Sequence, residues 1–517
     1  MLNRGSKGFL KGAFILAAAG LLSKVLGIFF KIPLQRLIHD EGMGLFGLPY
    51  PIYTVMLSIS IIGFPAAISK LIAEKTAVND IAGARQIFRV SLSMLAITGA
   101  VTSIILYFGA PGIITLLDWP QEAYYSIIGL AFAPFFVSLM SAFRGYFQGM
   151  EVMFPTAISQ ITEQSGRVII GVVLAYTYIN QGIGYAAGAA SFGATMGAFL
   201  GLIPLLIYYF KIIHPRHRKI REQYRPKDNY RVAKQILIIA IPITIGAILS
   251  SVMALVDAIL VPARLLQGGY TVEGGTILYG QLTGKAVTLI NVPLTFSMAM
   301  AASLVPTISQ SFSRNNVFHL REKATTGIKV TMLIALPATI GLMLLASPII
   351  HLLWGANEAG GEILSVLAIN VVFISLAQSL TSILQGIGKV YIPVRNLMIG
   401  VLVKIIISYI LLVSHWNILG AVIGSICGYV IVMLLNYISV KRLLKLKLSL
   451  LEVLIKPLIA AGGMGITTLY SFKYLTYYFS SEGIVTLGTI FISITVYFIL
   501  ITILGSLNLK ESRDFFR

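Results

Sequence analysis

Residues 183–210 read IGYAAGAASFGATMGAFLGLIPLLIYYF, a stretch that contains no charged side chain. An α-helix rises about 1.5 Å per residue, so roughly 20 apolar residues cross the hydrocarbon core of a bilayer. This stretch therefore predicts a transmembrane helix. The whole chain has 517 residues, of which 57% are hydrophobic and 11% charged, whereas soluble domains average about 25% charged residues. We expect an all-α membrane protein with no soluble catalytic domain.

The same criterion, applied along the chain, predicts about fourteen transmembrane helices. Their ranges are 9–37, 46–75, 86–109, 123–148, 156–179, 183–210, 235–263, 279–311, 326–349, 362–386, 394–414, 418–440, 450–472 and 483–506. The first range, with three alanines at 17–19, could pass for a cleavable signal peptide. It continues past Lys24 with no polar mature domain behind it, so we interpret it as a retained helix.

Basic residues are concentrated at both ends of the chain and in every second loop, whereas the intervening loops are acidic or neutral. The basic positions include Arg4, Lys7, Lys75, Arg85, Arg144, Arg314, Arg321, Lys389, Lys441, Arg442, Lys510 and Arg517. Cytoplasmic loops carry an excess of Lys and Arg, so both termini are expected to be cytoplasmic. The net charge of +20 then indicates topology and contact with anionic lipid, and we expect no nucleic-acid partner.

Two halves of the chain are related by an internal repeat. Ile68-Ser69 recurs as Ile308-Ser309 and Gln148-Gly149 as Gln385-Gly386, and matching positions stay 236 to 240 residues apart. This predicts an N-terminal lobe (1–211), a basic cytoplasmic linker (212–234), a second lobe (235–445) and a final part (446–517) with two extra helices and a cytoplasmic tail. Six helices per repeat give both copies the same direction in the membrane. Parallel repeats are a transporter architecture, with the substrate site between the halves.

Ionisable side chains inside spans are costly, so each one is a candidate for function. Lys24, Lys31, Lys70 and Lys285 lie deep in predicted spans or along a face that could line a cavity, without an evident local acid. We expect them to bind substrate. A group of cations suits a phosphate or pyrophosphate, whereas an exporter of cationic drugs needs an acidic cavity.

The other charged positions allow more than one interpretation. Arg36 and Arg264 are further candidates for substrate binding, but they lie near span ends and could instead reach the interface. Glu163 and Arg167 are four residues apart and could form a structural ion pair. Asp257 could neutralise a lysine or bind a coupling cation. The single cysteine excludes a disulfide framework, and we expect neither a metal site nor catalytic residues.

Three motifs resemble a known family. They are Ser23-Lys24-Val25-Leu26-Gly27, the segment GFPAAISK at 63–70, and RGYFQG at 144–149 followed by PTAISQ at 155–160. Together they resemble the polysaccharide-flippase branch of the multidrug/oligosaccharidyl-lipid/polysaccharide (MOP) exporter superfamily. Within that branch, the chain is similar to the bacterial group of MurJ-type lipid II flippases and stage V sporulation protein B-like proteins.

The resemblance implies two six-helix lobes around a cationic cavity, and two C-terminal helices that line a groove for an isoprenoid tail. It implies contacts from Lys24, Lys70 and Lys285 to a lipid-linked pyrophosphate; Lys31 has only an approximate counterpart. Family members often have Arg at the position of Lys24, so charge attraction is kept here but bidentate binding is not. Some members bind sodium, to which Asp257 and Asn396 could contribute, although a second acidic ligand is missing.

These observations lead us to expect a flippase that moves an undecaprenyl-pyrophosphate-linked saccharide, such as lipid II, across a bacterial cytoplasmic membrane by alternating access. We expect a monomer in contact with the bilayer and with cell-envelope synthesis proteins. We expect no cofactor and no ATP site, because the sequence has no Gly-rich phosphate loop; membrane potential, sodium or protons would drive transport. The alternatives are a cation-coupled multidrug antiporter and a membrane-embedded glycosyltransferase or ligase.

Overall fold

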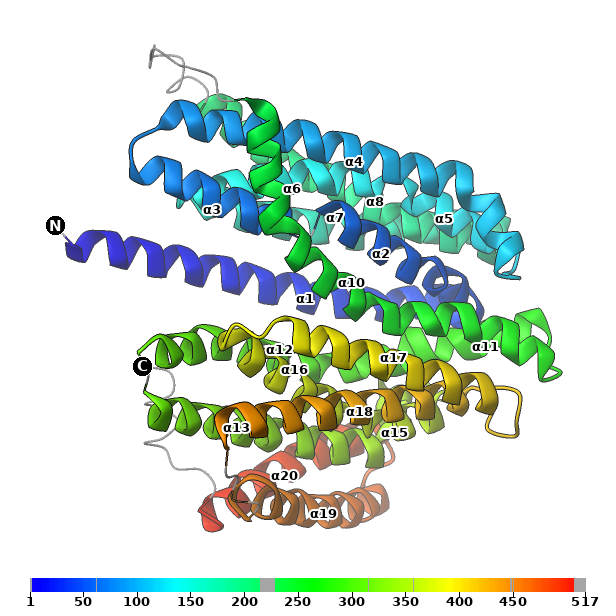
Figure 1. The fold of residues 1–517 in the computed structure, drawn as a ribbon. Coiled ribbons are helices and arrows are strands. Elements are labelled where there is room, and N and C mark those ends of the chain that lie inside the picture. The colour runs from blue at the N-terminus through cyan, green and yellow to red at the C-terminus, as the bar shows by residue number, and fades with distance from the viewer. Residues whose placement is uncertain are drawn as a thin grey trace. The chain divides into compact units, whose positions relative to one another are not determined.

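The computed structural model describes residues 2–61, 63–213, 228–314, 316–356, 358–446, 449 and 451–505. The side chains of residues 2–14, 17, 28, 242, 243 and 245–250 are not described. All regular elements in the described ranges are helices, and these ranges contain no strand (Figure 1). The all-α prediction is therefore confirmed. Most of the predicted linker, and the tail from 506 onwards, lie outside the described residues.

The chain divides into two compact units, residues 1–263 and 264–517. The helices that begin in the first unit are α1 (Leu2–Gly47), α2 (Pro49–Ile61), α3 (Phe64–Ala77), α4 (Ile81–Leu116), α5 (Ala123–Ala131), α6 (Ala133–Gly149), α7 (Phe154–Tyr178), the 3₁₀ turn η1 (Ile179–Gln181), α8 (Ile183–Tyr208), the π turn η2 (Tyr209–Ile213) and α10 (Asn229–Gln267). The boundary falls inside α10, and the predicted lobes 1–211 and 235–445 stay a prediction.

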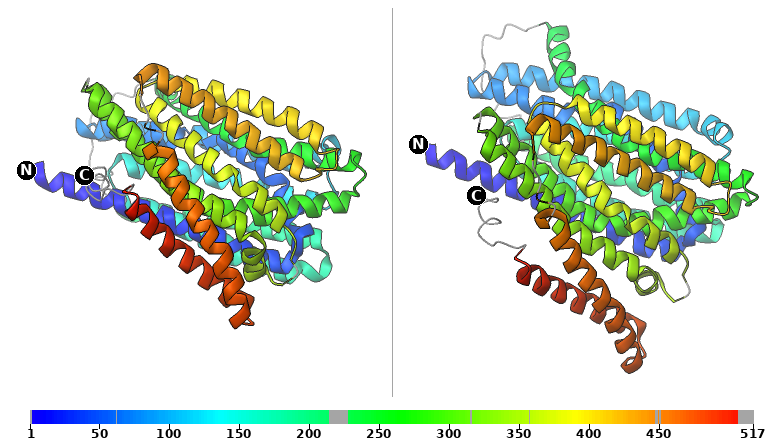
Figure 2. Two further views of the ribbon diagram at one scale, coloured as in Figure 1. Left: turned by 90° about the horizontal axis from the view of Figure 1, so that it is seen from below. Right: turned by 60° about the horizontal axis from the view of Figure 1, so that its bottom comes forward.

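The second unit continues from the end of α10. Its elements are α11 (Val272–Gly280), the π turn η3 (Gln281–Ala286), α12 (Val287–Ser313), α13 (Val317–Leu344), α14 (Ala346–Trp354), α15 (Gly361–Ala368), α16 (Asn370–Gly386), α17 (Tyr391–Leu411), α18 (Leu419–Leu444), the π turn η4 (Leu451–Ile455), α19 (Lys456–Tyr478) and α20 (Glu482–Ile503). The last two helices lie side by side and pack on α13 and α14 (Figure 2).

Eleven helices among the described residues are long and apolar enough to cross a membrane. Several of these spans join two helices across a short break, such as α2 with α3 and α15 with α16. Helices α1, α7 and α10 are counted as spans in the sequence prediction but are not among the eleven. The multi-span fold is confirmed, whereas the number fourteen is not.

Glycines let neighbouring helices approach closely in both units. In the first unit, a Cβ on Gly197 of α8 would lie 2.5 Å from the Glu163 carbonyl oxygen of α7. In the second unit, a Cβ on Gly400 of α17 would lie 2.8 Å from the Gly428 carbonyl oxygen of α18. Small residues at helix contacts are typical of membrane proteins, where packing replaces the hydrophobic driving force. The repeat thus places the same kind of close helix pair in each unit.

The motif at 63–70 contains a break between α2 and α3. A Cβ on Gly63 would lie 2.0 Å from the carbonyl oxygen of Ala240 on α10, so only glycine fits there. The Gly63 N–H donates to the Thr244 hydroxyl at 3.2 Å. Pro65 follows in the first turn of α3, where its missing N–H costs no helical hydrogen bond. The motif therefore fixes a crossing between two helices of the first unit.

Candidate functional site

The predicted substrate-binding residues of the first unit lie on α1 and α3. Lys24 and Arg36 are exposed, and Lys31 is half-buried. Lys24 and Lys31 are seven residues apart, which places them on one face of α1.

Lys70 forms only a weak local contact. Its Nζ atom lies 4.0 Å from Oε1 of Glu74, one helical turn later on α3, and the side chains are 61% and 58% exposed. Exposed pairs of this kind contribute about 0 to 1 kcal/mol. The Lys70 ammonium group therefore remains accessible to an anion.

Lys285 of the second unit has a different environment. It lies on the π turn η3, and its side chain has no exposed surface. Its ammonium group donates to Oε2 of Glu358 at 2.6 Å and to the Ala359 carbonyl oxygen at 3.0 Å. Single π turns inside α-helices are frequent at functional sites. The expectation that Lys285 has no acid nearby is therefore wrong: sequence reasoning missed this pairing because Glu358 lies 73 residues from Lys285, in the connection between α14 and α15.

Arg264 contacts the end of α17. Its guanidinium carbon lies 3.7 Å from the centre of the Tyr409 ring, and its Nε and Nη2 donate to the Tyr409 carbonyl oxygen at 3.1 and 2.9 Å. It also donates to Gln267 on its own helix. These contacts give Arg264 a role in packing α10 against α17 within the second unit, and its predicted contact with substrate stays a prediction.

Glu163 of α7 lies between two arginines. Its Oε2 is 2.8 Å from Nη2 of Arg144 on α6, and its Oε1 is 3.8 Å from Nη2 of Arg167. Arg167 also donates to the Tyr50 hydroxyl of α2 at 3.0 Å, and Arg144 donates to Ser159 at 2.8 Å. The Ser159 hydroxyl in turn donates to the Gly201 carbonyl oxygen of α8 at 2.8 Å. Sequence reasoning placed Arg144 in a loop and so missed that it is nearer to Glu163 than Arg167 is.

The second unit has a network of amide and hydroxyl side chains at the matching repeat positions. Thr381 and Asn396 stand 237 residues after Arg144 and Ser159. The Asn396 side-chain amide donates to Oδ1 of Asn436 at 2.9 Å, and Asn436 donates to the Thr381 hydroxyl at 3.1 Å. Each unit therefore joins the same three helices of the repeat, α6–α8 and α16–α18, through buried polar groups.

Asp257 is half-buried on α10 in the first unit, whereas the fully buried Asn396 belongs to the second unit. The side-chain oxygen Oδ1 of Asn396 accepts hydrogen bonds from Nη2 and Nε of Arg395 at 3.2 and 3.3 Å. Within the described ranges, no group of three or more His, Cys, Asp or Glu residues is placed to hold a metal ion. A sodium site at these two residues stays a prediction.

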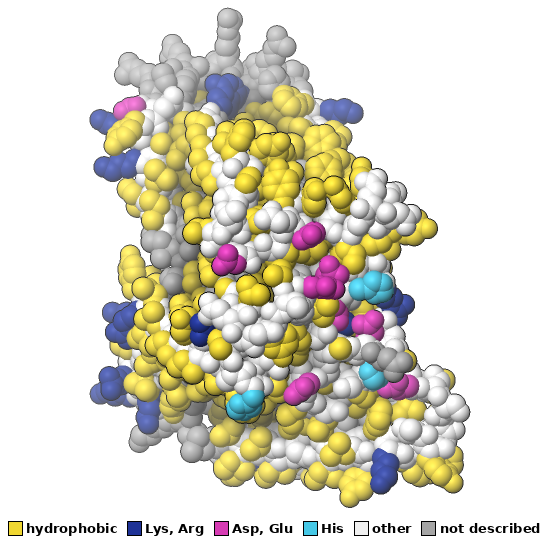
Figure 3. Space-filling model, turned by 90° about the vertical axis from the view of Figure 1, so that its right-hand side faces the viewer, with side chains coloured by type: hydrophobic (Ala, Val, Ile, Leu, Met, Phe, Trp, Pro, Cys, Tyr) yellow, Lys and Arg dark blue, Asp and Glu magenta, His cyan; other side chains and the backbone are white. Residues whose placement is uncertain are grey.

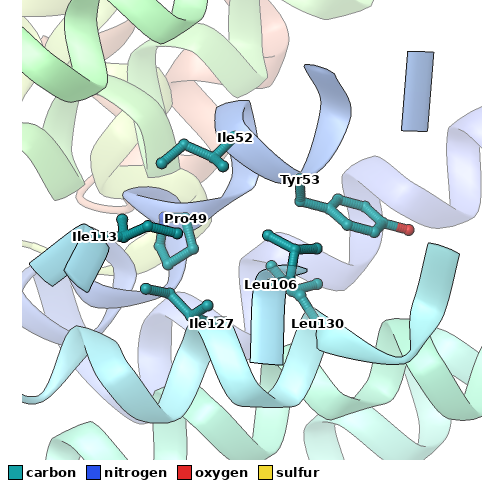
Figure 4. A pocket seen from close by; sticks show the side chains of 7 residues that line it. All are labelled: Pro49, Ile52, Tyr53, Leu106, Ile113, Ile127 and Leu130. Carbon is teal, nitrogen blue, oxygen red and sulfur yellow. The ribbon is translucent and has the colours of Figure 1, made fainter. Parts of the chain in front are cut away.

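Two apolar pockets accompany these polar groups. One lies in the first unit beside Tyr53, Leu106 and Leu130 and is about 10 Å³ in volume, which is no more than one water molecule needs (Figure 4). The other, about 370 Å³, lies between α12 and α13 of the second unit. Its walls include Leu289 and Pro293, which follow Lys285 by one and two helical turns.

Acidic side chains gather at one end of the helices. Figure 3 shows Asp, Glu and His side chains on the face that forms the right-hand end of the helices in Figure 1. This end carries loops for which the sequence predicts a negative charge.

A family model described as polysaccharide biosynthesis protein matches residues 9–312, more than half of the chain. The chain belongs to the polysaccharide biosynthesis protein family. A second model, MatE, matches residues 282–410. The predicted resemblance to the polysaccharide-flippase branch of the MOP superfamily is therefore confirmed.

Relatives of this polysaccharide biosynthesis family member cover most of its length. It is 28% identical to the lipid II flippase MurJ of Bacillus subtilis, over 84% of this chain and 83% of that protein. It is 25% identical to stage V sporulation protein B of the same organism, over 98% of this chain and 97% of that protein. The chain is thus a multi-span membrane protein homologous to bacterial membrane flippases.

Solved structures of two kinds share the fold of this family member. The lipid II flippase MurJ in an inward closed conformation matches with a TM-score of 0.69 at 18% identity, over 98% of this chain and all of that one. An inward-facing multidrug resistance transporter of the MATE family matches with a TM-score of 0.69 at 14% identity, over 84% of this chain and 98% of that one. At these identities the likeness establishes the fold alone.

Proposed function

We propose that this protein is a flippase that moves an undecaprenyl-pyrophosphate-linked saccharide, lipid II or a related cell-envelope precursor, across the cytoplasmic membrane by alternating access. The observation that carries the proposal is a set of four lysines, Lys24, Lys31, Lys70 and Lys285, inside the helices of a chain with few acids. Its relatives named as flippases support it at 24 to 28% identity.

The chemistry of the lysines suits the pyrophosphate group of such a lipid. A Lys ammonium attracts a phosphate as a point charge, and the attraction is stronger away from bulk water. Lys70 has only a weak partner in Glu74 at 4.0 Å. Lys24 is exposed. Both can therefore contribute to initial binding, and Lys285 is the buried cation of the set.

Energy for the cycle would come from the membrane potential, which acts on charge with about 2.3 kcal/mol per elementary charge per 100 mV. A sodium ion or proton is a further coupling candidate, with Asp257 as the acidic group. Both termini would lie in the cytoplasm, because basic residues accumulate at the ends and in alternate loops.

The test is reconstitution of the full chain in liposomes that contain fluorescent lipid II. The chemical quencher dithionite, added outside, measures how much lipid changes leaflet. Lys24→Ala, Lys70→Ala and Lys285→Ala should each reduce flipping at least tenfold while the protein still inserts. Lys389→Ala, an exposed lysine between α16 and α17, is the matched control and should flip normally. Wild-type flipping by all three variants would reject the assignment.

A cation-coupled multidrug antiporter is the second candidate, favoured by the match of the MatE model to residues 282–410. Its cationic substrates would be repelled by the four lysines. Uptake of ethidium by everted vesicles that contain the protein, driven by a proton or sodium gradient, would support this candidate over the flippase.

A further inference from the structure

Lys285 and Glu358 form an ion pair whose two partners differ in their surroundings. The Lys285 side chain has no exposed surface, whereas that of Glu358 is 33% exposed. A Cβ on Gly360 would lie 3.5 Å from Cδ of Lys285, so the backbone of the connection packs directly on the lysine stem. The lysine is anchored in a helical span, and the carboxylate approaches it from a connection between helices.

The connection that carries Glu358 has glycines on both sides with left-handed backbone angles. Gly355 has φ +125° and Gly360 has φ +113°, values that side-chain-bearing residues rarely adopt. Glu358 itself lies in no helix. Of the two partners, the carboxylate is therefore the one that can move with little cost to the packing of the helices.

A buried ammonium group needs an anionic partner. Transfer of a charge out of water costs several kcal/mol, and removal of one partner of a buried pair typically destabilises a protein by about 3 to 5 kcal/mol. At 2.6 Å, Glu358 supplies that partner in the structure. A phosphate group offers the same two things as the carboxylate, negative charge and oxygen acceptors.

We propose that Glu358 is a displaceable counter-ion, which competes with a phosphate group of the substrate for the ammonium group of Lys285. This inference rests on the proposed function. A phosphate and the carboxylate cannot share the ammonium group without repulsion between the two anions, so one leaves when the other binds. Return of Glu358 keeps Lys285 paired after the phosphate departs, and so favours release of the lipid.

The decisive variant is Glu358→Gln, which removes the competing charge and keeps the shape. The matched control is Glu362→Gln, an exposed acid four residues later in the first turn of α15. Binding to the purified full-length chain is measured by native mass spectrometry with three probes: undecaprenyl pyrophosphate, undecaprenol without phosphate, and inorganic pyrophosphate. Comparison of undecaprenyl pyrophosphate with inorganic pyrophosphate distinguishes binding of a lipid headgroup from binding of a free anion.

The expected result is that Glu358→Gln binds undecaprenyl pyrophosphate about tenfold more tightly than wild type. Glu362→Gln should match wild type, and the double variant Lys285→Met/Glu358→Gln should lose the gain. Lipid flipping by Glu358→Gln should be slower than in wild type, because release is impaired. An equal gain for inorganic pyrophosphate supports the exchange and shows that the phosphate alone is recognised.

Two results would overturn the inference in different ways. If wild type binds undecaprenyl pyrophosphate and Glu358→Gln binds it equally or more weakly, the proposed function stands and the ion pair is purely structural. Wild type that binds undecaprenyl pyrophosphate no better than undecaprenol would reject the proposed function and, with it, the exchange. If Glu358→Gln fails to fold, Glu358→Asp draws the carboxylate back by one methylene and should show a smaller gain in the same direction.

Discussion

The side-chain amide of Asn396 donates a hydrogen bond to Oδ1 of Asn436 at 2.9 Å, and neither side chain is exposed. This bond joins α17 to α18. Asn436 also donates to the Thr381 hydroxyl of α16 at 3.1 Å, so three helices of the second unit meet at one buried amide.

Replacement of Asn436 by Ala should destabilise the protein, because it leaves the buried Asn396 and the partly buried Thr381 without this amide. We expect a loss of about 0.6 to 2 kcal/mol, since hydrogen bonds between membrane helices average near the lower figure. Thermal unfolding in detergent measures the loss. Asn291→Ala, an exposed asparagine of α12, is the control and should unfold like wild type. Additive effects of Asn396→Ala and Asn436→Ala in a double-mutant cycle would contradict the coupling.

Glu163 should be far more important for stability than Glu74, although each lies one turn from a basic residue. The side chains of Glu163, Arg144 and Arg167 are 17%, 15% and 18% exposed, whereas those of Glu74 and Lys70 are 58% and 61% exposed. Glu163→Gln would leave two mostly buried arginines without a carboxylate. We expect a cost of about 3 to 5 kcal/mol for it, and below about 1 kcal/mol for Glu74→Gln.

The measurement is the temperature at which each variant unfolds in the same detergent. Arg144→Ala combined with Glu163→Gln should be more stable than Glu163→Gln alone, because one uncompensated charge has been removed. Equal stability of Glu163→Gln and Glu74→Gln would show that the network contributes nothing beyond an exposed pair.

Sequence reasoning found the features that depend on local composition. Apolar stretches predict the helices, and residues that recur at a constant separation predict the repeat, which the similar networks around Ser159 and Asn396 reflect. It failed where contact partners lie far apart in the chain. The acid that pairs with Lys285 is 73 residues away in the chain. Glycine is required at position 63 because a carbonyl oxygen of α10 lies against it. Hydropathy alone also does not identify α1 and α7 as membrane spans, because both helices carry charged side chains in their interiors.

Gly63→Ala should impair folding, because the added methyl group would lie 2.0 Å from the Ala240 carbonyl oxygen and the backbone must shift. Overpacking of this kind costs about 1 to 3 kcal/mol or more. Gly109→Ala on α4 is the matched control: nothing lies within 4 Å of the new atom, and alanine favours the helix. The yield of folded protein after size-exclusion chromatography should fall for the first variant and not for the second. Normal yield and stability of Gly63→Ala would show that this crossing tolerates a wider separation.

Substitutions at Arg264 and Tyr409 test whether Arg264, which is predicted to bind substrate, acts instead through helix packing. Its guanidinium group lies 3.7 Å from the Tyr409 ring centre and donates two hydrogen bonds to the Tyr409 carbonyl oxygen. A lysine at this position keeps the charge but loses the planar fork, so Arg264→Lys should lower stability. Tyr409→Ala removes the ring and should cost about 0.5 to 2 kcal/mol of stability beyond its lost packing, whereas Tyr409→Phe keeps both ring and carbonyl and should be neutral.

Thermal unfolding separates these variants, and lipid flipping at a temperature where all are folded gives the second readout. Packing alone predicts that Arg264→Lys unfolds earlier but flips at the wild-type rate; unchanged stability with reduced flipping would instead support direct contact of Arg264 with the lipid headgroup.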